Sequence, residues 1–497
     1  MNMGPAFALE DDLFLLPLVR PAGWSNPHPK PFYDLVVLGG GAAGLISAFG
    51  AVGMGARVAL VERDRLGGDC LNTGCVPSKA LAAFARHASG TNAVERLEDA
   101  RGAFRKARAR LAPNDSADRL SRSGVDLFFG EGAFASAASA QVEGLLLRFR
   151  TAALCVGASP VIPAIPGLAD CQPWTTASFF DLNRLPSSII ILGGGPVGCE
   201  LAQSLSRLGC KVHLIERDQA LLGREDAEAA QQVTQALIKD RVELCTGTRV
   251  LRAELTGAGV TLHLHSPNGP GLLTAEGVLS ATGRKPNLGN LSLDLASIQT
   301  AGDLPVVDCH LQTSNPRVFV AGDATGPPYL THRSGAHAAV LLQNALFPHP
   351  LGLGKARADR LLIPRCLHTD PAIAQVGLTA EEALSAAIPH EILTVPAIHV
   401  DRLELENEPG FLRLVLSPGS DRLLGATVVG KQAGELLFPA LDLMRSGRGL
   451  RSLLGLVLPY PARMEIWTRA AQIWRGNRFG KSPITRRWVR WLARRGP

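Results

Sequence analysis

Two cysteines five positions apart are the residues whose type and spacing most directly suggest chemistry in this 497-residue chain. Cys70 and Cys75 lie in the stretch Gly67–Lys79, which reads Gly-Gly-Asp-Cys-Leu-Asn-Thr-Gly-Cys-Val-Pro-Ser-Lys. Pro77 favours the first turn of a helix, where its missing N–H costs nothing. A thiol at the start of a helix faces unpaired N–H groups and the positive end of the dipole, which favour the thiolate. The spacing therefore predicts a reactive Cys75 that Cys70 can resolve as a disulfide; the alternative is two buried cysteines that only pack.

A nucleotide-binding pattern precedes the cysteines. An apolar segment at 33–38 runs into a G-x-G-x-x-G turn and then into a helix of small residues. The glycines of this turn are Gly39, Gly41 and Gly44. Glycines there allow a tight turn and the close approach of a pyrophosphate, which the N-terminus of the helix binds. A second apolar segment, 57–61, ends at Glu62, which is placed to accept hydrogen bonds from a ribose.

This combination resembles the flavin-dependent pyridine nucleotide–disulfide oxidoreductases over roughly residues 31–475, and most specifically at the cysteine stretch. The resemblance implies an α/β fold with two Rossmann-like dinucleotide-binding domains, one for FAD and one for NAD(P), and a C-terminal α+β dimerisation domain. It implies a homodimer in which each active site borrows residues from the partner subunit. It also implies an enzyme that passes electrons from a nicotinamide through FAD to the Cys70–Cys75 disulfide.

A second nucleotide unit follows at residues 188–216. Its glycines are Gly193, Gly195 and Gly198. Because the cysteine stretch belongs to the first unit, we expect FAD there and the nicotinamide in the second. The acid Glu216 stands at the same spacing from its turn as in the first unit, and a carboxylate there favours NADH because it repels the 2′-phosphate of NADPH. Arg217 and Arg224 nearby weaken that preference, and the alternative is that Glu216 is only a solvated acid at a strand end.

The resemblance assigns roles to several other residues. Cys75 is expected to lie against the flavin as a thiolate while Cys70 attacks the acceptor. Glu200 is expected to pair with Lys79, which points at the flavin and stabilises the negative charge of its reduced form; from the sequence alone both are equally readable as helix-surface charges. The remaining cofactor contacts that the resemblance implies are Gly68, Asp69, Gly157, Gly283, Arg284, Gly322, Asp323 and His332. For His332, a hydrogen bond near the flavin and the capping of a helix are both open.

The segment that supplies the borrowed residues departs from the family pattern. Family members carry His-Pro-Thr-x-x-Glu there, and the histidine is the acid/base for thiol–disulfide exchange. The segment Leu458–Glu465 reads Leu-Pro-Tyr-Pro-Ala-Arg-Met-Glu, which puts Tyr460 at the histidine position and keeps Glu465. A phenol, with a pKa of about 10, is a poor base at neutral pH, but it can donate a hydrogen bond to a thiolate or a bound acceptor. Chemistry of the glutathione reductase or dihydrolipoamide dehydrogenase type is therefore less expected.

A tyrosine at this position resembles the mercuric reductase branch. That branch delivers metal with a cysteine pair near the C-terminus, whereas the last cysteine here is Cys366, and no Cys-x-x-Cys module lies near the N-terminus. The acceptor is therefore either a disulfide or a metal-type substrate, and the sequence does not decide between them. In both cases we expect Tyr460 and Glu465 to position it. One alternative is a flavin electron donor to a quinone or membrane-associated acceptor; another is a non-catalytic interaction protein. The sequence predicts no resident metal site.

The chain is expected to divide into an extension, three domains and a tail. These are the extension 1–30, a discontinuous FAD domain at 31–160 and 281–350, an NAD(P) domain at 161–280, an interface domain at 361–475 and a basic tail at 476–497. The prolines of the extension predict a segment that packs in extended form. A long helix is expected over roughly 80–111, and strands at 410–416 and 423–429.

Composition bounds the class and the compartment. The length suits two to four domains, and 46% apolar residues indicate a globular chain. No apolar run is long enough to span a bilayer, and the start of the chain does not read as a signal peptide. Nine cysteines with a single motif pair suit a reducing compartment. We therefore predict a cytoplasmic protein.

The last residues form a basic amphipathic tail. Its apolar members Ile484, Trp488, Trp491 and Leu492 recur at helical spacing, and its basic members are Arg486, Arg487, Arg490, Arg494 and Arg495. A short basic helix with tryptophans can lie in an anionic membrane interface. Residues 484–495 are therefore a candidate site of contact with the inner face of a membrane. The alternative is a helix docked on the protein's own surface. No other basic patch is readable, so no nucleic-acid partner is expected.

Overall fold

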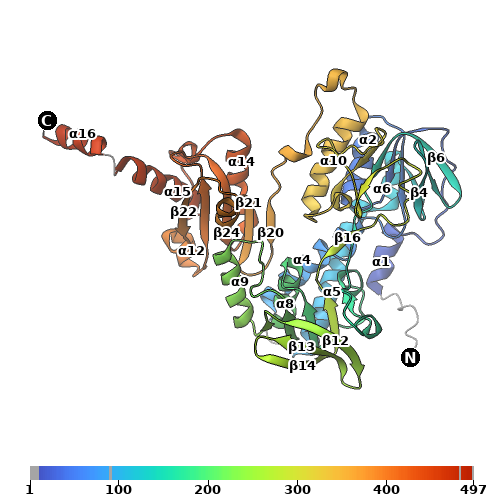
Figure 1. Ribbon diagram of the computed structural model, residues 1–497, viewed down its shortest axis with the longest axis horizontal. Helices are drawn as coiled ribbons and strands as arrows, with labels where there is room; N and C mark the ends of the chain where they lie inside the picture. Colours follow the sequence, from blue (N-terminus) through green and yellow to red (C-terminus); the bar gives the residue numbers. More distant parts are fainter. Residues whose placement is uncertain (1–9, 89–91, 481–482, 495–497) are drawn as a thin grey trace. The chain divides into compact units, whose positions relative to one another are not determined.

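The computed structural model describes residues 10–88, 92–480 and 483–494 (Figure 1). The chain forms two compact units. The first contains the residues up to 219 together with 241–361, and the second contains 220–240 together with the residues from 362 onwards. The larger sheets of the first unit are built on parallel strands, whereas the sheet of the second unit is antiparallel.

The first sheet of the first unit carries the cysteine-proximal nucleotide turn. Its strands, in spatial order, are β3 (Asp126–Phe129), β2 (Val58–Glu62), β1 (Tyr33–Leu38), β6 (Leu145–Leu154), β5 (Ser139–Val142) and β4 (Gly132–Ser136), with β19 (Val318–Val320) also paired to β6. Strands β1 and β2 are parallel, and Leu38 pairs with Val61. This register brings the turn that follows β1 beside Glu62 at the end of β2. Strand β2 is buried along its whole length, as a parallel strand covered on both faces should be.

Helices cover one face of this sheet. They are α1 (Glu10–Val19), α2 (Ala42–Gly53) and α10 (Thr331–Leu346), and their apolar residues share one core with the strands. The opposite face packs against the antiparallel strands β4 and β5 and against Leu291 and Ile298. Helix α2 follows the glycine turn directly, so its N-terminus faces the carboxyl edge of the sheet.

The second sheet repeats this arrangement. Its strands, in order, are β11 (Glu243–Cys245), β10 (Lys211–Ile215), β9 (Ser188–Leu192), β15 (Gly277–Ser280) and β8 (Trp174–Thr175), all parallel. Leu192 pairs with Ile215, so the second glycine turn lies beside Glu216 as the first lies beside Glu62. Helix α8 (Pro196–Arg207) follows the turn. The two sheets confirm the predicted pair of Rossmann-like units, whereas the domain boundaries stay predictions.

Smaller elements complete the first unit. They are α3 (Gly68–Asn72), α4 (Cys75–His87), α5 (Ala93–Leu111), α6 (Ala117–Ser123), β7 (Ala158–Pro160), α7 (Thr176–Phe179), β12 (Arg249–Thr256), β13 (Gly259–Ser266), β14 (Gly269–Ala275), β16 (Arg284–Pro286), β17 (Thr300–Ala301) and β18 (Leu304–Pro305). Strands β12, β13 and β14 form an antiparallel sheet, and β16 pairs with β7.

The second unit is an α+β structure. Its antiparallel sheet runs in the order β20 (Arg365–Leu367), β21 (Ala372–Gly377), β24 (Leu423–Gly430), β23 (Phe411–Leu416) and β22 (Glu391–Pro396). Its helices are α9 (Ala227–Lys239), α11 (Ala380–Ser385), α12 (Asp401–Leu405), α13 (Ala433–Leu436), α14 (Phe438–Ser446), α15 (Glu465–Arg475) and α16 (Pro483–Ala493). Trp467 of α15 lies in the core, and its indole N–H donates to the carbonyl of Leu436 at 2.7 Å. The strands expected at 410–416 and 423–429 are confirmed to within a residue.

The helix expected over roughly 80–111 is wrong as a single element. Helix α4 ends at His87, and α5 begins at Ala93 with the side chain of Asn92 accepting a hydrogen bond from the backbone of Glu95 at 3.1 Å. An asparagine cap starts a new helix because it satisfies a backbone N–H that has no partner within the helix. Two helices therefore replace the one that the alanine and arginine content suggested.

The extended form expected for residues 1–30 is wrong for its middle part. Residues 10–19 form helix α1, in which Leu15 and Val19 are buried in the core of the first sheet, while residues 1–9 lie outside the described part of the chain. Pro17 lies inside this helix. Burial of apolar side chains outweighs the local cost of that proline.

Among the described residues, no helix combines the length and the apolar character that crossing a membrane requires.

Candidate active site

The two cysteines lie where a short helix meets the first nucleotide turn. Cys70 is in α3, and Cys75 is the first residue of α4. Gly68 has a φ of 54°, and a Cβ added there would lie 2.8 Å from the Cα of Gly41. Glycine at position 68 therefore lets the backbone of the cysteine segment lie directly against the first glycine turn. The dinucleotide site and the cysteines are thus parts of one local structure.

The pKa values of the two thiols are shifted in opposite directions. The hydrogen bond from Cys70 is the largest cause that lowers the pKa of Cys75 to about 6, and the hydroxyl of Thr331 and the charge of Lys79 act in the same direction. The Cys75 Sγ lies 3.3 Å from the Thr331 Oγ1. The same hydrogen bond raises the pKa of Cys70. Both cysteines are free in this structure, so at neutral pH the pair consists of a Cys75 thiolate and a Cys70 thiol that donates to it.

Lys79 and Glu200 form the ion pair that the resemblance implied. The Lys79 Nζ lies 2.7 Å from a carboxylate oxygen of Glu200, whose side chain is buried in α8. Lys79 is one turn of helix beyond Cys75, so its positive charge reaches the thiolate. The pair therefore links the cysteine helix of the first nucleotide unit to the helix after the turn of the second.

Arg284 joins three segments that the sequence assigned to cofactor contacts. Its guanidinium pairs with the Asp69 carboxylate and donates to the carbonyl of Ala158, and its Nε lies 4.0 Å from a carboxylate oxygen of Asp323. Burial raises the pKa of Asp323. Glycines with positive φ stand in these segments: Gly157 at 67°, Gly283 at 143° and Gly322 at 68°. The predicted contacts thus come together around one arginine.

Glu62 holds the first turn in place. One of its carboxylate oxygens accepts from the backbone N–H of Gly40 at 2.6 Å, and the other accepts from that of Asp64 at 2.7 Å. Burial raises the pKa of Glu62. Each carboxylate oxygen has a second lone pair, so the acid can still accept from ribose hydroxyls as predicted.

The glycines of the first turn divide into two kinds. A Cβ on Gly44 would lie 1.8 Å from the carbonyl oxygen of Gly39, so Gly44 is needed for close packing. A Cβ on Gly41 would meet nothing nearer than 3.7 Å, so Gly41 leaves its outer side open to a pyrophosphate. A cavity of about 300 Å³ opens beside the turn. Its lining includes Leu38, Gly39, Glu62, Gly130, Val156 and Asn287. The open turn, the acid and the cavity fit the adenosine and pyrophosphate parts of FAD.

The second turn has the same construction. Glu216 accepts from the backbone N–H of Gly194 at 2.7 Å and from that of Asp218 at 3.0 Å. A Cβ on Gly198 would lie 1.9 Å from a backbone oxygen, whereas one on Gly195 would have nothing within 4 Å. The space left at Gly195 fits the pyrophosphate of a second dinucleotide.

His332 stays near the cysteines. Helix α10 begins at Thr331 with Leu330 as its N-cap, so His332 does not occupy the capping position. Since the Thr331 hydroxyl contacts Cys75, the neighbouring histidine lies at the same end of the site. His332 is therefore not the N-cap of α10, and its role near the flavin stays a prediction.

Tyr460 and Glu465 lie in the second unit. Tyr460 is 71% exposed, and its hydroxyl donates to a carboxylate oxygen of Asp401 at 2.8 Å, which raises the pKa of the phenol. Glu465 begins α15, and its carboxylate accepts from the backbone N–H of Ala462 at 3.1 Å. A phenol bonded to a carboxylate cannot act as a base near neutral pH. Sequence reasoning missed Asp401, because no motif marks the residue that orients Tyr460.

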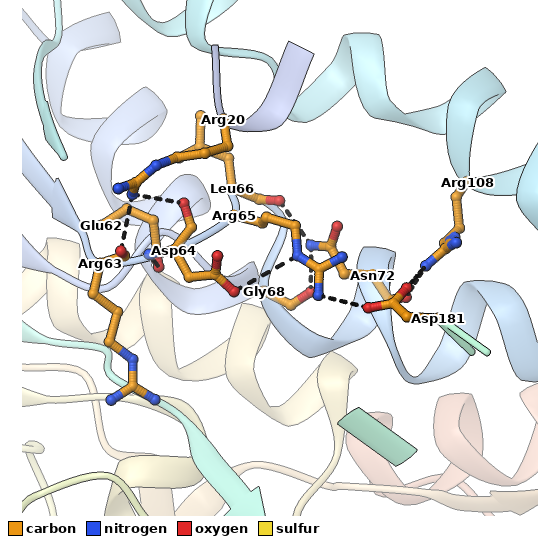
Figure 2. Close-up of polar contacts among 10 residues, drawn as sticks. All are labelled: Arg20, Glu62, Arg63, Asp64, Arg65, Leu66, Gly68, Asn72, Arg108 and Asp181. Atoms are coloured by element: carbon orange, nitrogen blue, oxygen red, sulfur yellow. Dashed lines mark hydrogen bonds and ion pairs between the residues drawn. The ribbon is translucent and has the colours of Figure 1, made fainter. Parts of the chain in front are cut away.

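Arg20 fixes the loop between Glu62 and the cysteines from one side (Figure 2). Its guanidinium donates to the carbonyls of Arg63 at 2.8 Å and Asp64 at 3.0 Å, and it lies 4.6 Å from the ring centre of Phe129. Arg20 directly follows α1, so the N-terminal extension contributes to the site. No sequence pattern indicates this role of Arg20, because its partners are backbone carbonyls distant in the chain.

Arg108 and Asp181 fix the same loop from the other side, as Figure 2 shows. Arg108 is fully buried, and one of its amino groups donates to the carbonyl of Asn72 and to the Asp181 carboxylate, both at 2.9 Å. Arg65 pairs with the other oxygen of Asp181 at 3.1 Å. The Asn72 side chain donates back to the carbonyl of Leu66 at 3.0 Å. The residues between Glu62 and Cys75 are thus held by buried charge.

Comparison with known families identifies both parts of the chain. The model described as pyridine nucleotide-disulphide oxidoreductase matches residues 33–340. The model described as the dimerisation domain of pyridine nucleotide-disulphide oxidoreductase matches residues 363–471. The first match covers both nucleotide turns and the cysteines, and the second covers Tyr460 and Glu465.

Three relatives illustrate the range of similarity. The chain is 30% identical to a mercuric reductase of Staphylococcus aureus, over 87% of this chain and 81% of that protein. It is 31% identical to a dihydrolipoyl dehydrogenase of Thermus scotoductus, over 88% and 97%. Among solved structures, the HOCl-induced flavoprotein disulfide reductase RclA of Escherichia coli matches with a TM-score of 0.77 and 26% identity, over 89% of this chain and all of that chain. Its Cu(II) complex matches with a TM-score of 0.78 and 25% identity, over the same shares.

The low proton affinity of Cys75 can be tested through its reactivity. An ordinary thiol loses its reactivity toward iodoacetamide below about pH 8.5. Because the pKa of Cys75 is lowered to about 6, we expect alkylation of reduced Cys75 to persist down to that pH. Cys70→Ala removes the hydrogen bond that lowers the pKa of Cys75 most, so the pH dependence of Cys75 alkylation should shift to higher pH. Thr331→Val removes a weaker contribution and should shift it less. Mass spectrometry of Cys75 alkylation gives the profile, and an unchanged profile in Cys70→Ala would contradict the assignment.

The buried charge behind the cysteine loop is tested by Asp181→Asn. The variant leaves the Arg108 guanidinium buried without its carboxylate, and because Asp181 is partly exposed we expect a loss of about 1–3 kcal/mol in the stability of this region. The urea concentration at which flavin is released should fall. Asp170→Asn is the matched control, since Asp170 is exposed. Equal midpoints for the two variants would mean that Asp181 does not hold the loop.

Proposed function

Because the chain belongs to the pyridine nucleotide-disulphide oxidoreductase family, we propose that it oxidises NADH and passes the electrons through FAD and the Cys70–Cys75 pair to a thiophilic metal ion. The observation that carries the choice of acceptor is the Tyr460 hydroxyl, which donates to Asp401. Bound FAD supplies the two-electron relay between the nicotinamide and the cysteines. The family and the intact motifs favour an enzyme over the non-catalytic interaction protein.

The proton balance distinguishes the two classes of acceptor. Reducing a disulfide to two thiols consumes two protons, and an acid must protonate the departing thiolate. Reducing a metal cation consumes no proton. One NADH becomes NAD⁺ with release of one proton, and its two electrons suffice to reduce one mercuric ion to the metal or two cupric ions to cuprous ions. The dithiol becomes a disulfide in this step and is re-formed by the next NADH. The hydrogen bond to Asp401 raises the pKa of Tyr460, which makes the phenol a poor proton donor near pH 7, and such a residue suits a metal acceptor.

The cysteine pair has the properties that a metal acceptor needs. Thiolate sulfur is the preferred ligand of soft metal ions. Cys75 is a thiolate at neutral pH, and the Lys79 charge helps to keep it so. Cys70 is half-buried and retains its proton until a metal displaces it. The second sulfur then completes a two-coordinate site from which both electrons can leave.

Two of the three named relatives agree with a metal acceptor, although the dihydrolipoyl dehydrogenase matches over as much of the chain. Mercuric reductases are among the proteins that match over most of the chain, and RclA has been solved with Cu(II). We place the enzyme in the cytoplasm, where its nine free cysteines stay reduced. The matched dimerisation domain supports a homodimer, and we propose that Tyr460 and Glu465 act in the site of the opposite subunit.

The acceptor is tested by anaerobic NADH oxidation with separate acceptors. Mercuric and cupric ions should be reduced at least tenfold faster than glutathione disulfide or lipoamide, because Tyr460 supplies no acid. Tyr460→His should raise disulfide reduction by about tenfold or more. Cys70→Ser should lower metal reduction by more than about 100-fold, while the matched control Cys309→Ser leaves it unchanged. Faster reduction of disulfides than of metals by the unmodified enzyme would overturn the proposal.

The quinone alternative predicts a different pattern. With Cys70 and Cys75 both replaced by serine, quinone reduction would continue and metal reduction would stop, because only the metal needs the thiols. Retention of metal reduction in this double variant would reject the dithiol route. The two results together assign the electron path.

The preference for NADH is tested at Glu216 and its neighbour. Glu216→Gln removes the charge that repels a 2′-phosphate and should raise kcat/KM for NADPH relative to NADH by about tenfold. Arg217→Gln removes a cation that attracts the 2′-phosphate, so kcat/KM for NADPH relative to NADH should fall. Steady-state kinetics with both coenzymes measure the ratios. Equal use of both coenzymes before mutation would remove the basis of the prediction.

A further inference from the structure

Helix α16 presents an apolar face to solvent. Four of its apolar side chains recur along one side, and their exposed fractions are high: Ile484 80%, Trp488 64%, Trp491 45% and Leu492 47%. With 3.6 residues per turn, these positions fall within one 100° sector, and Arg486, Arg487 and Arg490 fall on the other side. A cluster of exposed apolar side chains of this kind on one helix marks a site of interaction with a protein or a membrane.

The tail also carries the net charge of the protein. Residues 476–497 contain seven basic side chains and no acid, whereas the other 475 residues contain 44 basic and 44 acidic side chains. The whole excess of +7 therefore lies in the last 22 positions. A partner for this segment must be negatively charged and must accept apolar side chains at the same time.

An anionic bilayer satisfies both requirements. Tryptophan concentrates at the level of lipid headgroups, and arginine pairs with lipid phosphates. The 11 residues of α16 span only about 16 Å, which is too short to cross a bilayer but suits a helix lying in its interface. Single-stranded nucleic acid would use the tryptophans for stacking but would leave Ile484 and Leu492 in water. The composition of the apolar face therefore favours lipid.

The tail is tied to the folded second unit. Trp467 and Trp474 of α15 are buried in its core, and the ring centre of Phe479 lies 6.4 Å from that of Trp474. Only a short segment separates α15 from α16, which is the last helix of the chain in Figure 1. Attachment of α16 to a surface would therefore attach the enzyme as well.

We propose that α16 lies in the interface of an anionic membrane, with Ile484, Trp488, Trp491 and Leu492 among the upper acyl chains and its arginines against lipid phosphates. The protein is thereby a peripheral membrane protein, held by its own C-terminal helix. This inference does not depend on the electron acceptor, because none of these residues belongs to the active site.

Co-sedimentation of the holoenzyme with vesicles tests the proposal. Vesicles of phosphatidylcholine with about 30% phosphatidylglycerol should bind the enzyme at about 0.1 M salt, and pure phosphatidylcholine should not. Replacing Arg486, Arg487 and Arg490 by glutamine should weaken partitioning by about 100-fold, at roughly fivefold for each charge. Ile484→Ser with Trp488→Ser should also abolish binding if the apolar face inserts. NADH oxidation with the acceptor should stay unchanged in both variants in the absence of vesicles.

A matched control distinguishes the effect of the α16 arginines from the effect of the net charge of the protein. Lys106, Arg110 and Arg249 are exposed basic residues of the first unit, and their replacement by glutamine changes the net charge equally. This control variant should bind anionic vesicles like the unmodified enzyme. The proposal is overturned if the enzyme stays in the supernatant with anionic vesicles, if the control loses binding as strongly as the α16 variant, or if a single-stranded oligonucleotide displaces it from the vesicles and binds more tightly.

Discussion

The backbone of the cysteine segment approaches the backbone of the first nucleotide turn at Gly41 and Gly68, and the active site depends on that approach. A side chain at Gly68 would collide with the turn, so the position of the cysteine segment is fixed relative to the turn. Glu62 accepts a hydrogen bond from Gly40 of the same turn, so this acid is linked to the cysteine segment through the turn. Residues 63–72 connect these points and are held by Arg20 and Arg108 from opposite sides. Precise placement of a reactive sulfur needs such support from neighbouring contacts.

The electrostatics of the site follow from this placement. Because α4 begins at Cys75, the thiolate meets the start of a helix, the hydroxyl of Thr331 and the charge of Lys79 together. Glu200 balances Lys79, so the thiolate does not sit beside an uncompensated cation. In the neighbouring group, the single guanidinium of Arg284 faces the carboxyls of both Asp69 and Asp323, and burial raises the pKa of Asp323. Arg284 is thus the cation that offsets negative charge on this side of the cysteines.

Local motifs led to the predicted catalytic and cofactor residues, because glycine turns, the strand-end acids and the cysteine spacing depend on residues close in sequence. The structure adds partners that are distant in sequence. Asp181 lies 73 positions from Arg108, and Asp401 lies 59 positions from Tyr460. Nothing in the local pattern indicates such pairs. Helix α1 was mispredicted for the same reason: the prolines of the N-terminal extension suggest an extended segment, whereas Leu15 and Val19 of the helix are buried against a sheet formed by distant parts of the chain.

The features that distinguish this protein lie largely outside the shared family core. Mercuric reductases and a dihydrolipoyl dehydrogenase match it equally well, so overall similarity does not select the acceptor. Selection must depend on individual positions, and the proposed function rests on Tyr460, where a phenol replaces the histidine of the family pattern. The matched ranges also exclude both α1 and α16. The first adds Arg20 to the flavin-side loop, and the second adds a charged apolar helix. The two helices outside the matched ranges thus differ in their contacts: Arg20 after α1 bonds the loop that leads to the cysteines, and α16 exposes apolar and basic side chains.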